Sequence, residues 1–256
     1  VVPVHQQASA AGQRNINAIL FIGGIPQCQA VVLIITDEGH PVVFNDAVLS
    51  HFSIGHLVLS LDMAGQLYAA GHQSLHGVTG VITALGDDDT SHFVEAFLAR
   101  QNFAYAKLFT FPGQASSTSL VQVEENGKRC LSCYGGCIDR LTFDMLDKEV
   151  FHHTRYVHLG VMRPQLMLDI CRYCKENTNA IVSIDSGNLS RENTDMLLPY
   201  ADIFIPDNKT VERTLHMSEP DACRYYAAHG AKIACVTAAE RGTYAYDGRT
   251  MYHVSA

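Results

Sequence analysis

The feature that most constrains the fold is the alternation of short apolar runs with amphipathic segments along the chain. Residues 201–254 show it most clearly. The apolar run ADIFIP is followed by two helical segments, an apolar run ending at Val236-Thr237, and a hairpin around Asp247-Gly248. Apolar strands that alternate with helices are typical of a parallel sheet whose two faces are covered by helices. The sequence therefore predicts an α/β protein.

The same alternation extends toward the N-terminus. Nearly continuous apolar runs predict strands at 18–24, 80–86, 156–160 and 180–185. Helical periodicity predicts helices at 56–75, 163–176 and 191–199. Another helix should begin after Asp87-Asp88, because acidic residues and Ser/Thr satisfy the free N–H groups of a first helical turn. We therefore interpret Asp87 and Asp88 as turn and capping residues.

Two stretches interrupt this rhythm with extended, alternating sequence. Residues 29–45 form two apolar runs around Asp37-Glu38-Gly39, and residues 107–136 alternate around the turn Glu125-Asn126-Gly127. Such turns between alternating runs predict antiparallel hairpins. We expect one domain over residues 1–256, with lid strands around 29–45 and 107–136.

Composition excludes several classes of protein. The 256 residues carry a formal net charge of −8 at pH 7, and Lys and Arg form no cluster, which argues against a nucleic-acid partner. No apolar run reaches the roughly 18–20 residues of a membrane span. No charged segment precedes an apolar stretch with a cleavage site, so we expect a cytoplasmic protein without a membrane partner.

The eight cysteines allow two interpretations. The spacings of Cys130, Cys133 and Cys137, and of Cys171 and Cys174, are compatible with zinc binding. However, the first group lies along a predicted strand, where side chains alternate between faces, and the second lies within an amphipathic helix. We therefore favour buried free thiols over a zinc site.

Several segments, taken in order, resemble the PfkB (ribokinase-like) family of carbohydrate kinases. They are TGVITALGDDD (79–89), STSLVQVEENGKRCLSCYGGCIDRLTFDML (117–146), RYVHLG (155–160), AIVSIDSGN (180–188) and VTAAERG (236–242). The resemblance implies a three-layer α/β/α ribokinase-like domain with a small β lid. It also implies ATP-dependent phosphorylation of a sugar or related small alcohol, with ATP and Mg²⁺ as cofactors.

The resemblance further implies roles for particular residues. It assigns nucleotide binding to Thr237, Gly242 and Asp185. It assigns substrate binding to Tyr134 and Arg140. Magnesium binding is assigned to Asn208 and Glu212 by residue type. By the spacing of the family's Pro-Asn-x-x-Glu element, it is assigned to Asp207 and Thr210 instead. Each also has an ordinary explanation as a strand-to-turn junction, a helix cap, a packing residue or a surface ion pair.

The sequence departs from the family at positions that carry its chemistry, including the sugar site. Cys28 and Leu67 replace an aspartate and an asparagine, Asp62-Met63 replaces two glycines, Ile138 replaces an asparagine, and Ala239 replaces a glycine. Apolar side chains cannot pair with sugar hydroxyls, and a Cβ obstructs close approach of backbone to a ligand. This leaves open a non-catalytic protein that binds a nucleotide or a protein partner, including a second copy, or a nucleoside kinase relative.

The family's catalytic Gly-Ala-Gly-Asp segment does not occur in the 256 residues, and the resemblance would place it after Ala256. The catalytic residue is therefore unassigned. We expect these residues by themselves to be inactive or nearly so, either as a fragment of a longer protein or as a short homologue. Robust turnover in a phosphorylation assay would contradict this expectation.

Overall fold

The computed structural model describes residues 16–21, 32–35, 41–44, 58–59, 79–100, 103–123, 129–160 and 162–256. Several sequence predictions lie outside these ranges: the replacement at Cys28, the window 62–67, most of the helix at 56–75, and the turns at 37–39 and 125–127. None of the described helices has the length and apolar character needed to cross a bilayer.

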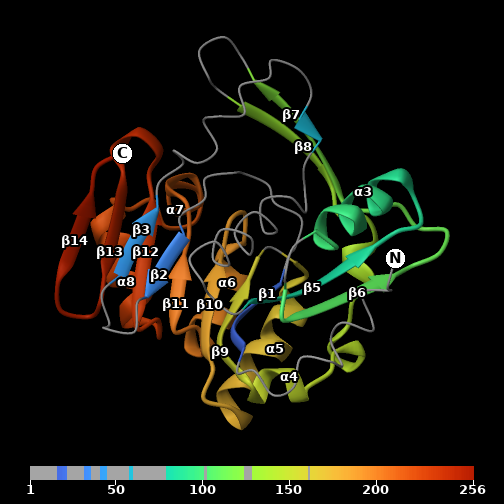
Figure 1. The fold of residues 1–256 in the computed structure, drawn as a ribbon. Helices are drawn as coiled ribbons and strands as arrows, with labels where there is room; N and C mark the ends of the chain where they lie inside the picture. The colour runs from blue at the N-terminus through green and yellow to red at the C-terminus, as the bar shows by residue number, and fades with distance from the viewer. Residues whose placement is uncertain are drawn as a thin grey trace.

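Within the described residues, a nine-stranded sheet forms the centre of the molecule, in the order β14-β13-β12-β11-β10-β9-β1-β5-β6 (Figure 1). The strands from β12 to β6 in this order are parallel, and β13 and β14 are antiparallel additions at one edge. Their bounds are β1 (Ile16–Phe21), β5 (Thr79–Leu85), β6 (Tyr105–Thr110), β9 (Thr154–Leu159), β10 (Ile181–Asp185), β11 (Ile203–Ile205), β12 (Ile233–Thr237), β13 (Thr243–Tyr246) and β14 (Met251–Val254).

The order of the strands reverses at β1. The chain builds β5 and β6 on one side of β1, then returns to place β9 on its other side and continues outward through β10, β11 and β12. In open α/β sheets, ligands bind outside the carboxyl ends of the strands near such a reversal. The topology therefore directs attention to the residues that follow β10, β11 and β12.

Two small antiparallel sheets accompany the large one. The predicted hairpin at 29–45 is confirmed, because β2 (Val32–Ile35) pairs with β3 (Pro41–Phe44). β7 (Thr118–Val123) pairs with β8 (Arg129–Tyr134) and with β4 (Val58–Leu59), and β7 and β8 project away from the large sheet (Figure 1). The helix predicted from residue 56 is wrong at Val58–Leu59, because these residues extend to pair with β7.

The helices α3, α5, α6, α7 and α8 agree with the sequence predictions, and the short helix α4 was not predicted. Their bounds are α3 (Asp89–Leu98), α4 (Glu149–His152), α5 (Pro164–Asn177), α6 (Arg191–Leu197), α7 (Asn208–Leu215) and α8 (Glu219–Ala228). Short 3₁₀ turns are η2 (Gly136–Arg140), η3 (Phe143–Met145), η4 (Leu198–Tyr200) and η5 (Ala239–Arg241). Side chains of Asp88, Ser190, Asp207 and Ser218 cap the N-termini of α3, α6, α7 and α8, which explains where each begins.

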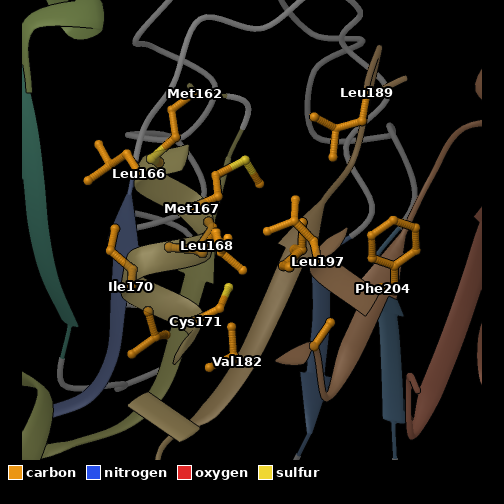
Figure 2. Close-up of a cluster of buried hydrophobic side chains, with 14 of the residues drawn as sticks. Met162, Leu166, Met167, Leu168, Ile170, Cys171, Val182, Leu189, Leu197 and Phe204 are labelled. Carbon is orange, nitrogen blue, oxygen red and sulfur yellow. The ribbon is translucent and has the colours of Figure 1, made fainter. Parts of the chain in front are cut away.

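The core lies on both faces of the large sheet. On β5, Ile82 and Ala84 join the main core, whereas Val81 and Leu85 pack on the opposite face with Val94 and Leu98 of α3. Alternation along a strand produces this division. Figure 2 shows the main core, where α5 contributes Leu166, Met167, Ile170 and Cys171 beside Val182 and Phe204 of the sheet. The fold is a three-layer α/β/α domain, as predicted.

The cysteines whose side chains are described are buried. Besides Cys137, they are the free thiols Cys171, Cys174, Cys223 and Cys235. Burial raises the pKa of the Cys174, Cys223 and Cys235 thiols to about 12, so they stay protonated and unreactive at neutral pH. The prediction of buried free thiols is confirmed for Cys171, Cys174, Cys223 and Cys235.

Candidate functional site at the carboxyl ends of β10, β11 and β12

Polar side chains gather where three adjacent parallel strands end. Asp185 is the last residue of β10, Asp207 follows β11, and Thr237 is the last residue of β12. The backbone brings them together, because Asp185 pairs with Ile205 and Asp207 forms a bridge with Thr237, whose N–H donates to Pro206 O at 3.1 Å. We call Asp185, Ser186, Asp207, Asn208 and Thr237 the carboxyl-edge cluster.

Asp185 has an unusual electrostatic environment. Its Oδ1 accepts a hydrogen bond from the N–H of Gly187 at 3.1 Å. Burial, aided by the nearby Asp207 carboxylate, raises the pKa of Asp185 to about 6, and no cation of the described residues is among the groups that shift it. A carboxylate held in this way costs stability until a cation or a hydrogen-bond donor compensates it.

Ser186 is the residue of the cluster that the sequence predictions missed. It is fully buried, and in the described part of the chain its hydroxyl has no hydrogen-bond partner. Its N–H donates to Ile205 O at 3.2 Å, which fixes the backbone against β11. Buried hydroxyls are nearly always paired, so this one indicates a place for a polar ligand.

The N-terminus of α7 lies in the same cluster. Asp207 caps it by accepting from Thr210 N–H at 2.7 Å, and the Thr210 hydroxyl accepts from Asn188 N–H at 3.2 Å. Asp207 and Thr210, the alternative magnesium pair, are therefore partly used by the cap. Asn208, the first residue of α7, is at the cluster. A helix N-terminus favours phosphate groups through its free N–H groups and its dipole.

Glu212 is one helical turn further along α7. Its side chain is 77% exposed and pairs with His216 at 3.9 Å. The structure therefore places Asn208, but not Glu212, directly at the strand ends. The assignment of these two residues to magnesium stays a prediction.

The loop after β10 is held by α7. Asn188 has a φ of 64°, and its Oδ1 accepts from Arg213 Nη1 at 2.8 Å. A second Arg213 nitrogen donates to Leu189 O at 3.3 Å. These contacts fix the loop that carries Ser186, so the cluster is preorganised rather than free to collapse.

The turn from Thr237 to Gly242 completes this edge. Gly242 has a φ of 80°, and a Cβ at this position would lie 2.0 Å from Val254 O of β14. Glycine is therefore required here by the close approach of the hairpin. This requirement accounts for Gly242 without a nucleotide, and its assignment to nucleotide binding stays a prediction.

Ala239, in the same turn, has a φ of 48°, in the left-handed region that L-residues avoid at a cost of roughly 1–2 kcal/mol. The PfkB family, which this turn resembles, has a glycine at this position. We expect Ala239→Gly to raise thermal stability slightly, because the relieved strain exceeds the entropy gained by the unfolded chain, about 0.4–1 kcal/mol. We also expect it to bind MgATP more tightly, because backbone without a Cβ approaches phosphates more closely.

The control for this prediction is Ala238→Gly, because Ala238 has an ordinary φ of −133°. That variant should only lose stability. Differential scanning fluorimetry with and without MgATP measures both effects. Equal behaviour of the two variants would contradict the role of the left-handed position.

Tyr134 and Arg140 do not lie on the strands that carry the cluster. Tyr134 is the last residue of β8 and 58% exposed, and Arg140 is the last residue of η2 and exposed. Both belong to the projecting hairpin and its return to the body. Their assignment to substrate binding stays a prediction.

Asp87 and Asp88 follow β5 at the same edge of the sheet. Asp88 caps α3 by accepting from Ser91 N–H at 2.9 Å, and Asp87 accepts from Gly113 N–H at 2.9 Å. The interpretation of both as turn and capping residues is confirmed.

Comparison with solved structures defines the class of fold. An adenosine kinase from Sinorhizobium meliloti has a TM-score of 0.70 at 16% identity, covering 95% of this chain and 80% of its own. An Arabidopsis thaliana ribokinase complexed with ribose and ATP has a TM-score of 0.65 at 13% identity, covering 94% of this chain and 78% of its own. An E. coli protein given as a candidate ribokinase II, in complex with ATP and Mg²⁺, has a TM-score of 0.65 at 16% identity. The match covers 94% of this chain and 79% of the E. coli chain. The fold is ribokinase-like.

Residues 64–256 match the family described as pfkB family carbohydrate kinase. The chain therefore belongs to this family, as the sequence motifs indicated. No curated protein matches the chain.

Proposed function

We propose that this protein transfers the γ-phosphoryl group of ATP to a hydroxyl group of a sugar or related small alcohol. The observation that carries the proposal is the carboxyl-edge cluster, in which Asp185 and Ser186 at the end of β10 and Thr237 at the end of β12 flank β11 beside the N-terminus of α7. Membership of the pfkB family supports the same chemistry. The proposal also places the protein in the cytoplasm, where ATP is available to a kinase.

The residues of the cluster suit a magnesium nucleotide. Two carboxylates, an unpaired buried hydroxyl and a helix N-terminus are complementary to phosphates and to hydrated Mg²⁺. Among the described residues, no group of three or more His, Cys, Asp or Glu side chains could hold a metal ion. Asp185, Asp207 and Asn208 would hold the ion together with the phosphates.

Each group has a distinct task in this proposal. Bound Mg²⁺ neutralises negative charge on the phosphates. The Asp185 carboxylate would hold the ion, and the Ser186 and Thr237 hydroxyls would orient phosphate oxygens. The projecting β7–β8 hairpin covers the acceptor and excludes water, which would otherwise compete for the phosphoryl group. No residue is assigned as the base for the acceptor hydroxyl.

The acceptor is a sugar or a nucleoside in this proposal. Two of the similar structures are a ribokinase with bound ribose and an adenosine kinase. The family's asparagine position in the segment after the hairpin is Ile138, which is 4% exposed and part of the main core. This observation favours a second candidate function, a protein that binds nucleotide but has lost the sugar site.

Nucleotide binding is tested first. A ligand present at one hundred times its Kd stabilises the native state by about 2.7 kcal/mol. This corresponds to a rise in Tm of roughly 5–10 °C for a domain of this size. We expect such a rise with MgATP and a smaller one with ATP in EDTA. Thr237→Val, which keeps the shape of the side chain but removes its hydroxyl, should lower nucleotide affinity about tenfold.

The matched control is Thr250→Val, an exposed threonine in the β13–β14 turn. It should leave the MgATP shift unchanged. No shift with millimolar nucleotide would overturn the proposal. Because these residues are expected to be inactive by themselves, acceptor binding separates the two functions. A shift with MgATP but no further rise in Tm with any pentose, hexose or nucleoside would select the second candidate function.

A further inference from the structure

Asp88 makes more contacts than a helix cap requires. Its Oδ1 accepts from Ser91 N–H at 2.9 Å, which is the capping bond, and from the Ser116 hydroxyl at 2.8 Å. Its Oδ2 accepts from Ser116 N–H at 2.7 Å. Although burial raises the pKa of Asp88, these hydrogen bonds outweigh it and lower the pKa, so the carboxylate is ionised at neutral pH. Two of the three bonds go to a residue 28 positions away.

Ser116 is fixed from the other side by β5. It is 2% exposed, and its hydroxyl accepts from Gly86 N–H at 2.9 Å while it donates to Asp88. Gly86 allows this contact, because a Cβ there would lie 2.1 Å from Gln114 O. Asp87 adds a neighbouring bond from Gly113 N–H. The segment 113–116, which leads into β7, is therefore held on the carboxyl end of a fully buried strand.

The chain that leaves the hairpin is bound to the same segment. Cys137 N–H donates to Ala115 O at 3.0 Å, and the Ser117 hydroxyl donates to Gly135 O. Gly136 has a φ of 58°, and a Cβ there would lie 2.6 Å from Ala115 O. The entry and exit of the hairpin, 113–117 and 135–137, thus form one compact unit, which we call the hairpin root.

From these contacts we infer that Asp88 is a positioning residue that anchors the hairpin root to β5 and α3. Through the root it sets where the β7–β8 hairpin stands over the edge of the sheet. The anchoring rests on the described contacts alone. Its consequence for phosphoryl transfer to the acceptor rests on the proposed function.

Asp88→Asn separates anchoring from capping. Asn is as good an N-cap as Asp, so α3 should remain intact. However, the Asn side chain replaces one acceptor oxygen with an NH₂ group, which opposes Ser116 N–H and removes a charge-assisted hydrogen bond. Ser116→Ala is the second variant. It removes the hydroxyl that links Asp88 to Gly86, and it supplies the measurement if Asp88→Asn does not fold.

Ser91→Ala is the matched control. The Ser91 hydroxyl donates to Asp88 O at 2.6 Å, so its loss weakens the first turn of α3 but leaves both carboxylate contacts to Ser116. Native-state hydrogen exchange resolves the two effects. We expect Asp88→Asn and Ser116→Ala to speed exchange of the Ser116 and Cys137 amides about tenfold without changing the centre of α3. Ser91→Ala should speed exchange only in the first turn of α3.

Unchanged exchange at the root in both variants, or equal loosening by Ser91→Ala, would overturn the anchoring role. The consequence for the reaction has its own measurement. With a phosphorylated acceptor identified, Asp88→Asn should raise the KM for that acceptor and leave the Kd for MgATP unchanged. Failure to find any acceptor would count against the proposed function but not against the exchange result. A parallel loss of MgATP affinity would overturn the positioning role, because it would show a general structural defect.

Discussion

Replacing Asp202 with alanine is expected to lower the free energy of unfolding by about 3 kcal/mol, the largest loss that we predict for a single side chain. Asp202 is 6% exposed and immediately precedes β11. Its Oδ2 accepts from Val182 N–H of β10 at 2.9 Å, and its Oδ1 pairs with Lys232 at 2.7 Å and more distantly with Lys175 at 3.9 Å. The side chain therefore links the beginnings of three strands.

The magnitude follows from the groups left behind. A buried N–H without an acceptor costs about 1–3 kcal/mol, and the hydrogen bond to an ionised group contributes about 1.5–3 kcal/mol. The two lysines are largely exposed, so the ion pairs add at most about 1 kcal/mol. Chemical denaturation at neutral pH measures the loss. Asp202→Asn is the comparison, because its amide oxygen still accepts from Val182, and it should lose only about 1 kcal/mol. Equal losses in the two variants would contradict the part assigned to Val182 N–H.

Replacing Asp185 with asparagine is expected to raise the free energy of unfolding at pH 7.5 by about 1–2 kcal/mol and to weaken MgATP binding. Burial raises the pKa of Asp185 to about 6 from the ordinary 3.8, so ionising it at neutral pH costs the folded state stability. Asparagine carries no charge, and its oxygen can still accept from Gly187 N–H. The gain is smaller than the full conversion of the shift, about 3 kcal/mol, because the buried amide is also polar.

Asp185 makes the free energy of unfolding depend on pH. Between about pH 4 and pH 6 the folded protein binds the Asp185 proton and the unfolded chain does not, so wild-type stability falls as the pH rises through this window. The variant lacks this group. The two proteins should therefore differ little near pH 4 and differ fully above pH 6.

Urea denaturation at several pH values, with Asp144→Asn as an exposed control, measures the difference. A variant less stable than the wild type at pH 7.5 would contradict the electrostatic argument. Retention of the full MgATP-induced rise in Tm would contradict the role of Asp185 in binding. A residue that destabilises the empty protein but supports the ligand is the usual pattern at a functional site.

Much of the fold was predictable because it depends on short-range patterns. The strands around β5, β9, β10 and β12 and the helices α5 and α6 follow from periodicity that extends over only a few residues. The prediction was wrong at Val58–Leu59, where a helical pattern gave way to pairing with β7. A partner strand distant in sequence can override local preference, and nothing nearby in the sequence reports it.

The candidate site was predictable in part. Asp185 and Thr237 were expected at strand ends, and the structure places them there on β10 and β12, the two strands on either side of β11. Ser186 was missed, because only the packing around it shows that its hydroxyl is buried without a partner. Gly242 was assigned to a nucleotide, but its contact with Val254 O gives it a structural reason that the sequence does not reveal.

The α/β class, the order of most elements and the family could be inferred from the sequence alone. These depend on hydrophobic periodicity, capping residues and local motifs, which are properties of neighbouring residues. Properties that depend on distant groups became visible only in the folded protein. The raised pKa of Asp185 requires burial and Asp207, and the anchoring role of Asp88 requires Ser116, 28 positions away. Electrostatics and hydrogen bonding act through space, so chemistry at the site depends on how the sheet brings separate segments together.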